Sequence, residues 1–570
     1  MTTKLNEAIK ALNTMDFYTL VDMTFGDLLD AQAARYPNND CLIARARDAH
    51  FTYAQFRDEC NTIARGFMAM GIKKDDHVAI WATNYPQWIT TMFAAAKIGA
   101  VLVTVNTNYK RFELEYLLKQ SDSMTLVLIE KFKDSNYLQH LREICPELDE
   151  CKPGQLKSAA LPYLKNVIFL GEEKQPGMFN WNDLYTLAPK VPEEKRAAIQ
   201  ESLDPHDVIN MQYTSGTTGF PKGVMLTHHN VINNGKSIGD RKRLTPIDRE
   251  CIPVPLFHCF GCVLGVTSCI THASAIILVE SFNPVKVLDT IEAEKCTSVL
   301  GVPTMFISML NLPQFSQYNL TSLRTGIMAG SPCPIEIMKR VNTEMHVPEI
   351  VISFGMTESS PVTIMTSTDD PIEKRVTTIG TCQPNVELKI IDPETGKEVP
   401  PGTIGELLTR GYQVMKGYYK MPGATAQAID AEGWLHTGDL CSIDEDGYYK
   451  VSGRLKDIII RGGENIYPRE IEEFLYCHPD ISDVQVVSAP DEKYGEEVLA
   501  FIILNEGAHP TPEEIIEFAK KGISNYKVPR YVIFLDSFPM TDSGKIQKFK
   551  LREMGVEMLN LHNAAAIETA

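Results

Sequence analysis

A stretch rich in glycine and hydroxyl groups, residues 213–223, constrains this chain more than any other feature of its sequence. It reads Tyr-Thr-Ser-Gly-Thr-Thr-Gly-Phe-Pro-Lys-Gly. Glycines let backbone N–H groups approach an anion closely, while Ser and Thr hydroxyls and a lysine add donors and positive charge. The preceding run, Val208–Tyr213, predicts a short buried strand, and residues 224–231 have helical spacing. A strand, a loop and a helix start in this order predict a phosphate-binding loop.

This loop differs from a Walker A loop, in which a Ser or Thr after the lysine binds magnesium. Here Pro221 precedes Lys222 and Gly223 follows it, so no hydroxyl group stands next to the lysine. The sequence therefore predicts a phosphate loop of another kind. A solvated Gly/Thr turn is the alternative interpretation.

The stretch resembles the signature loop of the adenylate-forming superfamily, which contains acyl-CoA synthetases, the adenylation domains of peptide synthetases and firefly-type luciferases. Six motifs similar to those of the superfamily occur in its order, and the resemblance runs from about residue 23 to about residue 553. Besides the loop, they are residues 255–261, 352–358, 434–440, 454–468 and 539–548. Within the superfamily the chain looks most like the medium-chain fatty acid–CoA ligases.

The resemblance implies a nucleotide site, in which Thr214 and Lys545 also take part in catalysis. Its expected members are Thr214, Ser215, Gly216, Thr217, Thr218, Gly219, Lys222, Gly330, Ser331, Phe354, Gly355, Met356, Thr357, Asp439, Arg454 and Lys545. Several of these residue types suit the binding of a nucleotide and its metal ion. Phe354 offers a flat face to a purine, Asp439 can accept bonds from two ribose hydroxyls, and the Glu358 carboxylate suits Mg²⁺. Glu358 is thus expected to be catalytic and the metal ligand.

The resemblance also implies an acyl pocket, a CoA site and a hinge. The pocket would be lined by His258, Phe260, Gly301, Val302, Ala329 and Gly330, with His258 also catalytic. The CoA site would contain Gly462, Gly463 and Glu464, and the hinge would lie at Lys456. A histidine among aromatic residues is more often a packed core residue, which is the alternative interpretation of His258.

The spacing of apolar residues predicts an α/β protein with a parallel sheet. His77–Trp81 and 101–105 read as strands on either side of a helix at Tyr85–Gly99. Beyond residue 480, strands and a helix opened by a Thr511–Glu514 capping box predict a small α+β unit, with a poorly ordered tail from about Gly555. The resemblance implies a large N-terminal AMP-binding domain at 1–454, with layered α/β sheets and a small β-barrel-like part, a hinge at 455–457, and a mobile C-terminal domain at 458–570 that carries the catalytic lysine.

Composition excludes several classes of protein. A net charge of −18 disfavours a general nucleic-acid binder. The N-terminus lacks the pattern of a secretory signal, and the most apolar stretch, 263–279, is short for a membrane span. Thirteen irregularly spaced cysteines favour reduced thiols and a cytoplasmic location. The Cys259–Cys262 pair is interpreted as incidental.

Taken together, the sequence predicts an ATP-dependent acid–thiol ligase. A carboxylate and ATP would give an acyl adenylate and pyrophosphate, and CoA would then give acyl-CoA and AMP, with ATP, Mg²⁺ and CoA as cofactors. The expected substrate is a medium-chain fatty acid, with an aryl-acid CoA ligase or an acyl-carrier-protein ligase as alternatives. An amino-acid-activating domain is disfavoured because no Asp follows Phe257 through Val263. A non-catalytic nucleotide-binding regulator is the alternative from another class. The oligomeric state stays open, with a homodimer as one option.

Overall fold

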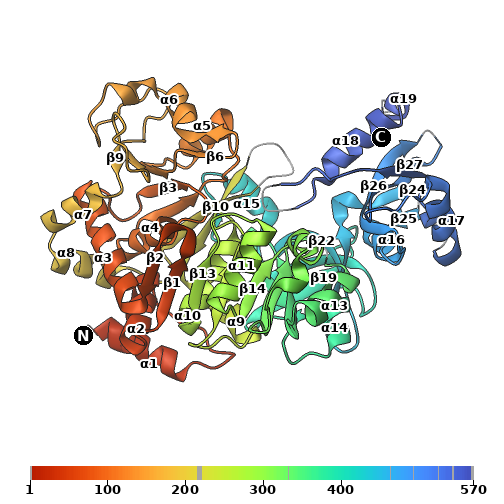
Figure 1. Cartoon of the computed structure of the whole chain (residues 1–570), viewed down its shortest axis with the longest axis horizontal. Coiled ribbons are helices and arrows are strands. Elements are labelled where there is room, and N and C mark those ends of the chain that lie inside the picture. The colour runs from red at the N-terminus through yellow and green to blue at the C-terminus, as the bar shows by residue number, and fades with distance from the viewer. Residues whose placement is uncertain are drawn as a thin grey trace.

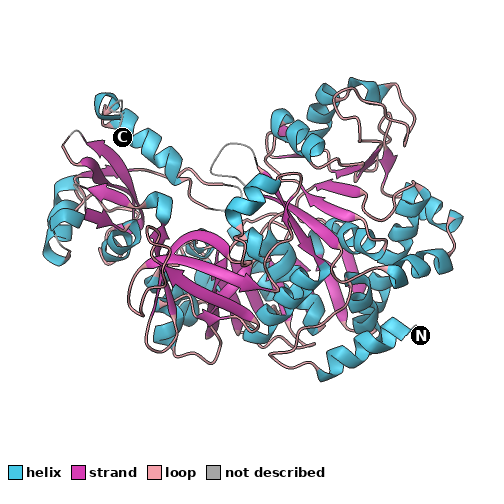
Figure 2. Cartoon of the chain, turned by 180° about the vertical axis from the view of Figure 1, so that it is seen from behind, coloured by secondary structure: helices cyan, strands magenta, loops and turns pink. Residues whose placement is uncertain are grey.

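The structure, a computed structural model, describes residues 3–214, 221–331, 333–461, 464–491, 493–523, 525–541 and 545–565. A large N-terminal part holds two broad sheets, and a smaller C-terminal part holds a sheet of its own (Figure 1). Figure 2 shows the C-terminal sheet standing apart from the others. The expected combination of a large α/β part and a small α+β part is confirmed.

The first large sheet has nine strands, and its inner strands run parallel to one another. In spatial order the strands are β18 (Thr381–Cys382), β17 (Val362–Met365), β16 (Glu349–Gly355), β15 (Thr325–Ala329), β14 (Ser298–Gly301), β12 (Arg249–Ile252), β13 (Ala275–Leu278), β1 (Asp40–Ala44) and β2 (Ala49–Thr52). The outer strands β2, β17 and β18 pair antiparallel. The inner strands are buried along their length, as expected for a parallel sheet that is covered on both faces.

The second large sheet has eight strands and contains the predicted strand–helix–strand unit. In spatial order the strands are β21 (Gly417–Tyr418), β11 (Lys222–Thr227), β10 (Val208–Thr214), β4 (Val101–Thr104), β3 (His77–Trp81), β5 (Thr125–Leu128), β8 (Asn166–Phe169) and β9 (Phe179–Asn180). A separate hairpin joins β6 (Lys131–Phe132) to β7 (Ser135–Asn136).

Helices pack against both large sheets, and one continuous apolar core joins side chains of the two sheets. The helices of the N-terminal part are α1 (Thr3–Thr14), α2 (Phe25–Arg35), α3 (Tyr53–Ala69), α4 (Pro86–Lys97), α5 (Arg111–Gln120), α6 (Tyr137–Ile144), α7 (Asp183–Leu187), α8 (Glu193–Ser202), α9 (His228–Arg241), α10 (Ser268–His272), α11 (Pro284–Glu294), α12 (Pro303–Leu310), α13 (Ile335–Glu344), α14 (Ile372–Thr377) and α15 (Pro422–Ala428). Almost every residue of α4 and α9 is buried, so these two helices belong to the core. Among the described residues, no helix is both long and apolar enough to cross a membrane.

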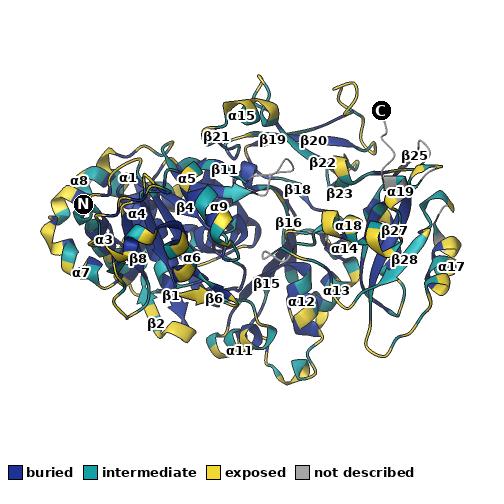
Figure 3. Cartoon of the chain, turned by 90° about the horizontal axis from the view of Figure 1, so that it is seen from above, coloured by how far each residue is buried: buried dark blue, intermediate teal, exposed yellow. Residues whose placement is uncertain are grey.

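A four-stranded antiparallel sheet follows the large sheets, where a small barrel-like part is expected. Its strands are β19 (Val386–Ile391), β20 (Gly405–Gly411), β22 (Leu435–Ile443) and β23 (Tyr449–Arg454). The C-terminal sheet then contains β25 (Glu464–Ile466), β24 (Ile459–Arg461), β27 (Gly495–Leu504), β26 (Ile481–Asp491) and β28 (Tyr531–Phe534). Helices α16 (Pro468–Leu475), α17 (Pro512–Gly522), α18 (Lys548–Met558) and α19 (His562–Ala565) accompany it. Exposed residues gather on outer helices such as α17, whereas the large sheets are buried (Figure 3).

Local signals correctly predict two helix starts. Thr52 and Gln55 form a capping box at the start of α3, and Thr511 and Glu514 form another at the start of α17. In each case the threonine hydroxyl accepts a hydrogen bond from the backbone N–H three residues later. The side chain of that later residue, Gln55 or Glu514, accepts a hydrogen bond from the backbone N–H of the threonine.

The prediction of a helix directly after the phosphate loop is wrong, because Lys222–Thr227 form strand β11. This strand pairs antiparallel with β10, from Thr214 opposite Lys222 to Val208 opposite Thr227. Helix α9 begins only at His228, with Thr227 as its cap. The described residues on either side of the loop therefore form a hairpin rather than a strand and a helix.

The prediction of a poorly ordered tail from about Gly555 is also wrong for the described residues, since α18 continues to Met558 and α19 follows. Gly555 is buried against β27, and a Cβ atom there would lie 2.4 Å from Leu499 Cδ2. This close contact fixes the helix on the sheet. The last residues, 566–570, lie outside the described part.

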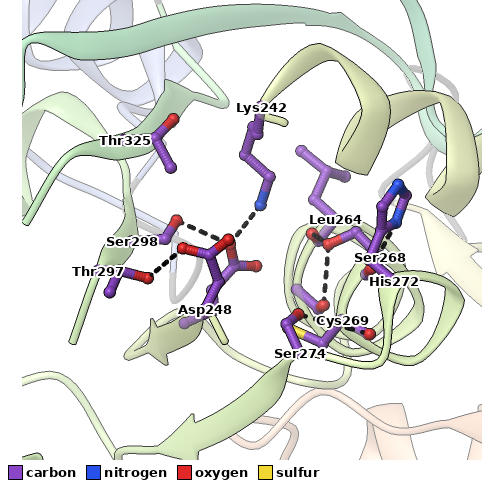
Figure 4. Close-up of polar contacts among 12 residues, drawn as sticks. Lys242, Asp248, Leu264, Ser268, Cys269, His272, Ser274, Thr297, Ser298 and Thr325 are labelled. Carbon is purple, nitrogen blue, oxygen red and sulfur yellow. Dashed lines mark hydrogen bonds and ion pairs between the residues drawn. The ribbon is translucent and has the colours of Figure 1, made fainter. Parts of the chain in front are cut away.

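A row of charged and hydroxyl side chains joins the amino ends of β12, β14, β15 and β16. Lys242 binds Glu250, and both side chains are fully buried; Ser298 Oγ donates to the same Glu250 oxygen over 2.8 Å. Arg324 bridges Asp248 and Glu349, at 2.7 and 2.8 Å. Figure 4 shows Lys242 pointing toward the strand start that carries Thr297 and Ser298. This network ties neighbouring strands together at one edge of the sheet.

Removal of one partner of the buried ion pair is expected to destabilise the fold. Lys242→Met leaves the Glu250 carboxylate buried without its cation, which costs roughly 3–5 kcal/mol of unfolding free energy. The double variant Lys242→Met/Glu250→Leu removes both charges and is expected to lie closer to the wild type. Urea unfolding of the four proteins of this double-mutant cycle measures the coupling, and additive losses would contradict the assignment.

Candidate functional site

The carboxyl ends of β12, β14, β15 and β16 meet at one edge of the nine-stranded sheet. These strands are parallel neighbours, so the loops that follow them open on the same side. The loop after β12 carries His258 and Phe260, and β14 and β15 lead directly into Val302 and Gly330. The sequence-predicted pocket residues are thus brought to one edge, opposite the buried charge network.

A small apolar pocket lies at this edge. Four of the six predicted acyl-pocket residues line it, namely His258, Phe260, Val302 and Gly330, together with Val254, Pro255 and Lys545. The other two, Gly301 and Ala329, are not among its lining residues. Gly301 faces α12, where a Cβ atom would lie 2.8 Å from the Phe306 ring, and Ala329 is packed in the core at 5% exposure.

His258 is held as a neutral imidazole. The backbone N–H of Phe260 donates to His258 Nδ1 over 3.1 Å, so Nδ1 acts as an acceptor and Nε2 carries the proton. Burial, and then the charge of Lys545, lower the pKa of His258 to about 3. His258 therefore offers the pocket a hydrogen-bond donor, its Nε2–H group, that carries no charge.

Lys545 reaches this pocket from the C-terminal part of the chain. The segment before α18 extends back to the large part (Figure 1), and Lys545 Cε lies 3.9 Å from the position that a Gly330 Cβ would take. Burial lowers the pKa of the Lys545 ammonium, while the thiol of Cys259 and the carboxylates of Asp439 and Glu358 oppose this shift. The half-buried lysine thus brings its amino group to the apolar pocket.

The base of the phosphate loop lies beside a tyrosine that the sequence analysis missed. Thr214 and Lys222 stand opposite each other at the end of the β10–β11 hairpin, and Lys222 Nζ lies 4.9 Å from the centre of the Tyr418 ring. The Tyr418 hydroxyl donates to Glu358 Oε1 over 2.8 Å. Ser215, Gly216, Thr217, Thr218 and Gly219 lie outside the described residues.

Tyr418 reaches this position because β21 pairs with β11, with Tyr418 opposite Val224. No local pattern signals this role, since the residues that Tyr418 joins are far away in the sequence. Lys222, Tyr418 and Glu358 form a continuous chain of contacts between the phosphate loop and the expected metal ligand.

Glu358 follows β16 in a tight turn and is only 7% exposed. The turn needs Gly355, because a Cβ atom there would lie 1.8 Å from the Pro361 carbonyl oxygen. In the described part of the chain, the second carboxylate oxygen of Glu358 has no hydrogen-bond partner. A single carboxylate beside a phosphate loop suits Mg²⁺, which is usually bound by one or two carboxylates, phosphate oxygens and water. The residues present therefore fit the expected ion.

Asp439 and Arg454 form an ion pair across β22 and β23. Arg454 Nε lies 3.0 Å from Asp439 Oδ1, and the two residues are directly opposite in the strand register. The Asp439 side chain is 7% exposed, whereas that of Arg454 is 51% exposed. Burial raises the pKa of the Asp439 carboxyl group, and Arg454 and Lys545 counteract this. Arg454 thus orients the Asp439 carboxylate and offsets the free-energy cost of burying its charge.

The remaining predicted residues divide between the two parts of the chain. Phe354 lies near the end of β16, Met356 and Thr357 follow this strand at the same edge, and Ser331 follows Gly330 after β15. Lys456 is exposed in the short turn Leu455–Asp457 between the two parts. Glu464 opens β25 in the C-terminal sheet, and Gly462 and Gly463 lie outside the described residues.

Comparisons with known proteins show the family of the chain. Residues 29–419 match the AMP-binding enzyme family, and residues 470–545 match the AMP-binding enzyme C-terminal domain. The chain is 54% identical to YngI of Bacillus subtilis (strain 168), which is provisionally named an acyl-CoA synthetase, over 96% of this chain and 99% of YngI. It is 41% identical to the mitochondrial medium-chain acyl-CoA ligase ACSF2 of Bos taurus, over 95% of this chain and 89% of that protein.

A solved structure extends this similarity to the whole fold. The anthranilate CoA ligase AuaEII, in complex with anthranoyl-AMP, superimposes with a TM-score of 0.83 at 26% sequence identity. The match covers 96% of this chain and 99% of that ligase. The similarity therefore includes both the large and the small part.

Proposed function

Because this chain belongs to the AMP-binding enzyme family, we propose that it acts as an AMP-forming acyl-CoA synthetase. A carboxylate attacks the α-phosphorus of ATP and releases pyrophosphate, and the thiol of CoA then attacks the acyl carbon and releases AMP. The position of Lys545 carries this proposal. A cation from the small part lies against the apolar pocket of the large part, with Glu358 and Asp439 among the carboxylates near it.

Positive charge is what the first half-reaction requires, since a carboxylate must approach a polyanionic nucleotide. Lys545 would bridge the carboxylate and the α-phosphate, and the hairpin end at Thr214 and Lys222 would hold the outer phosphates. Mg²⁺ at Glu358 would neutralise charge on the phosphates. His258 would donate its Nε2 proton to the carboxylate or to the acyl oxygen. Glu358 is buried and the other groups are half-buried, so electrostatic interactions among them are stronger than in bulk water.

The nucleoside would lie between the ends of β15 and β16 and the four-stranded sheet. Phe354 would stack on the adenine, and the Asp439 carboxylate, oriented by Arg454, would accept bonds from the ribose hydroxyls. Gly330, Ser331, Gly355, Met356 and Thr357 would border the same site.

A movement of the small part would separate the two half-reactions. We place the hinge at residues 455–457 with Lys456 at its centre, between a domain at 1–454 and a domain at 458–570. Asp457 is bound to Arg552 of α18 at 2.5 Å, which links the turn to the small part. Rotation there would withdraw Lys545 and bring Gly462, Gly463 and Glu464 to the CoA thiol.

The proposed substrate is a medium-chain fatty acid. The apolar lining of the pocket and the 41% identity to a medium-chain acyl-CoA ligase support this choice. An aryl acid is the second candidate, which the similarity to an anthranilate CoA ligase supports. A carrier-protein thiol in place of CoA, a homodimeric state and a cytoplasmic location stay predictions.

Lysine 545 should be needed for one half-reaction only. Lys545→Ala is expected to lower adenylate formation by about 10²–10³-fold, because it removes the charge that meets the transition state. Thioester formation from supplied acyl adenylate and CoA should be largely retained. ATP–pyrophosphate exchange and acyl-CoA release measure the two steps. Lys550→Ala, an exposed lysine of the same segment, serves as the control, and equal loss of both steps in Lys545→Ala would contradict the assignment.

Tyr418 should position the metal-binding carboxylate. Tyr418→Phe keeps the ring beside Lys222 but removes the hydroxyl that binds Glu358, so adenylation should fall by roughly 10–100-fold and require more Mg²⁺. The matched control is Tyr419→Phe, which removes the neighbouring hydroxyl that donates to Asp122 instead. A Mg²⁺ dependence that is identical in Tyr418→Phe and the wild type would refute the positioning role.

The substrate class can be tested by AMP release with purified protein, ATP, Mg²⁺ and a panel of straight-chain and aromatic acids. We expect CoA-dependent AMP release, with the highest kcat/KM for medium-chain fatty acids. A preference for benzoate-like acids would select the aryl alternative. Turnover with acyl carrier protein but not with CoA would select the carrier-protein alternative, and an absence of turnover with every acid would favour a non-catalytic regulator.

A further inference from the structure

Three side chains of metal-binding types lie together outside the proposed active site. Asp22, His206 and His229 each offer one ligand atom, and these atoms all lie within 4.8 Å of one another. Asp22 Oδ1 is 2.7 Å from His229 Nδ1 and 3.9 Å from His206 Nε2. The centres of the two imidazole rings lie 4.7 Å apart, with the ring planes tilted by 35°. The residues come from the segments before α2 and β10 and from the first turn of α9.

Hydrogen bonds to the backbone hold these three segments in place. The His229 N–H donates to the Pro205 carbonyl oxygen over 2.8 Å, which fixes the loop that carries His206 against α9. Asn233, one turn further along α9, is only 2% exposed. Its amide oxygen accepts from the Val21 N–H at 2.8 Å, and its Nδ2 donates to the Val21 carbonyl oxygen at 3.0 Å. These bonds fix the backbone next to Asp22 and His206 against α9.

We propose that Asp22, His206 and His229 bind one divalent transition-metal ion of the Zn²⁺ type. Two imidazole nitrogens and one carboxylate oxygen suit Zn²⁺, Co²⁺ or Ni²⁺, whereas Mg²⁺ and Ca²⁺ prefer oxygen ligands alone. Metal–ligand bonds of about 2.0–2.2 Å place ligand atoms roughly 3–4 Å apart. The two measured separations from Asp22 Oδ1, 2.7 and 3.9 Å, lie close to this range.

Small rotations of two side chains complete the geometry. The side chains of Asp22 and His206 are 70% and 67% exposed, so they can adjust without disturbing the core, whereas His229 is 13% exposed and acts as the fixed ligand. The open side of the site leaves room for water as a fourth ligand. The site is thus partly preformed and reachable from solvent.

The proposed ion would join the segment before α2 to the start of α9. Helix α9 directly follows β11, the second strand of the hairpin that carries the phosphate loop. Bound metal would therefore stabilise the contact between the N-terminal segment and this part of the core. None of the three ligands belongs to the proposed nucleotide or acyl site, so the role is structural.

The test uses the full chain without a histidine tag, after treatment with a chelator. Co²⁺ is titrated while its visible absorption is recorded, Zn²⁺ binding is measured by calorimetry, and the Tm is measured with and without Zn²⁺. The test variants are His206→Ala and Asp22→Asn, whose side chains are exposed. His50→Ala is the matched control, since His50 forms a pair with Asp40 at the same 2.7 Å but belongs to no group of three ligands in the described part of the chain.

We expect one equivalent of metal in the wild type and in His50→Ala, and an increase in Tm with Zn²⁺. In His206→Ala and Asp22→Asn the affinity should fall at least tenfold, with the Tm without metal unchanged. Binding of equal affinity in these variants would overturn the proposal, as would an absence of binding in the wild type. A Co²⁺ spectrum with intense thiolate bands would also overturn it, because the ion would then lie at cysteines.

Discussion

The antiparallel pairing of β10 with β11 is the constraint on which the proposed active site depends. It places Thr214 and Lys222 opposite each other and closes the phosphate loop at both ends. Because β11 also pairs with β21, the same hairpin brings Tyr418 beside Lys222 and against Glu358. Glu358 follows a strand of the other large sheet. One set of backbone hydrogen bonds therefore joins groups that belong to different sheets into one polar cluster.

The charged side chains near this cluster come from three different parts of the chain. Lys545 comes from the C-terminal part, Glu358 from the nine-stranded sheet and Asp439 from the four-stranded sheet. Burial makes each ion costly alone, so the ions stabilise one another only when all three parts meet. His258 adds polarity without charge, since burial and Lys545 keep its pKa low. These groups, together with the apolar pocket, suit the proposed ligand, which combines anionic and apolar groups.

Much of this architecture can be predicted from local sequence, because local interactions determine it. The capping boxes at Thr52 and Thr511 mark helix starts by bonds between residues three positions apart. The spacing of residues 224–231 predicts a helix, but the pairing of Lys222–Thr227 with β10 and β21 makes this segment strand β11. Tyr418 and the order of the C-terminal tail depend likewise on distant partners, so the sequence carries no local sign of them.

In the nine-stranded sheet, the amino ends and the carboxyl ends of the parallel strands have different roles. The amino ends of β12, β14, β15 and β16 are joined by buried ion pairs and hydroxyls around Glu250 and Asp248, and the carboxyl ends form the pocket. Side chains at the two edges share no partner among the described contacts. Mutations in the pocket loops therefore leave this network of ion pairs intact, and their cost in stability comes from the packing of buried lining residues such as Phe260 and Val302. The shape of the pocket can thus change through the loops at the carboxyl ends while the contacts that hold the strands together at their amino ends stay the same.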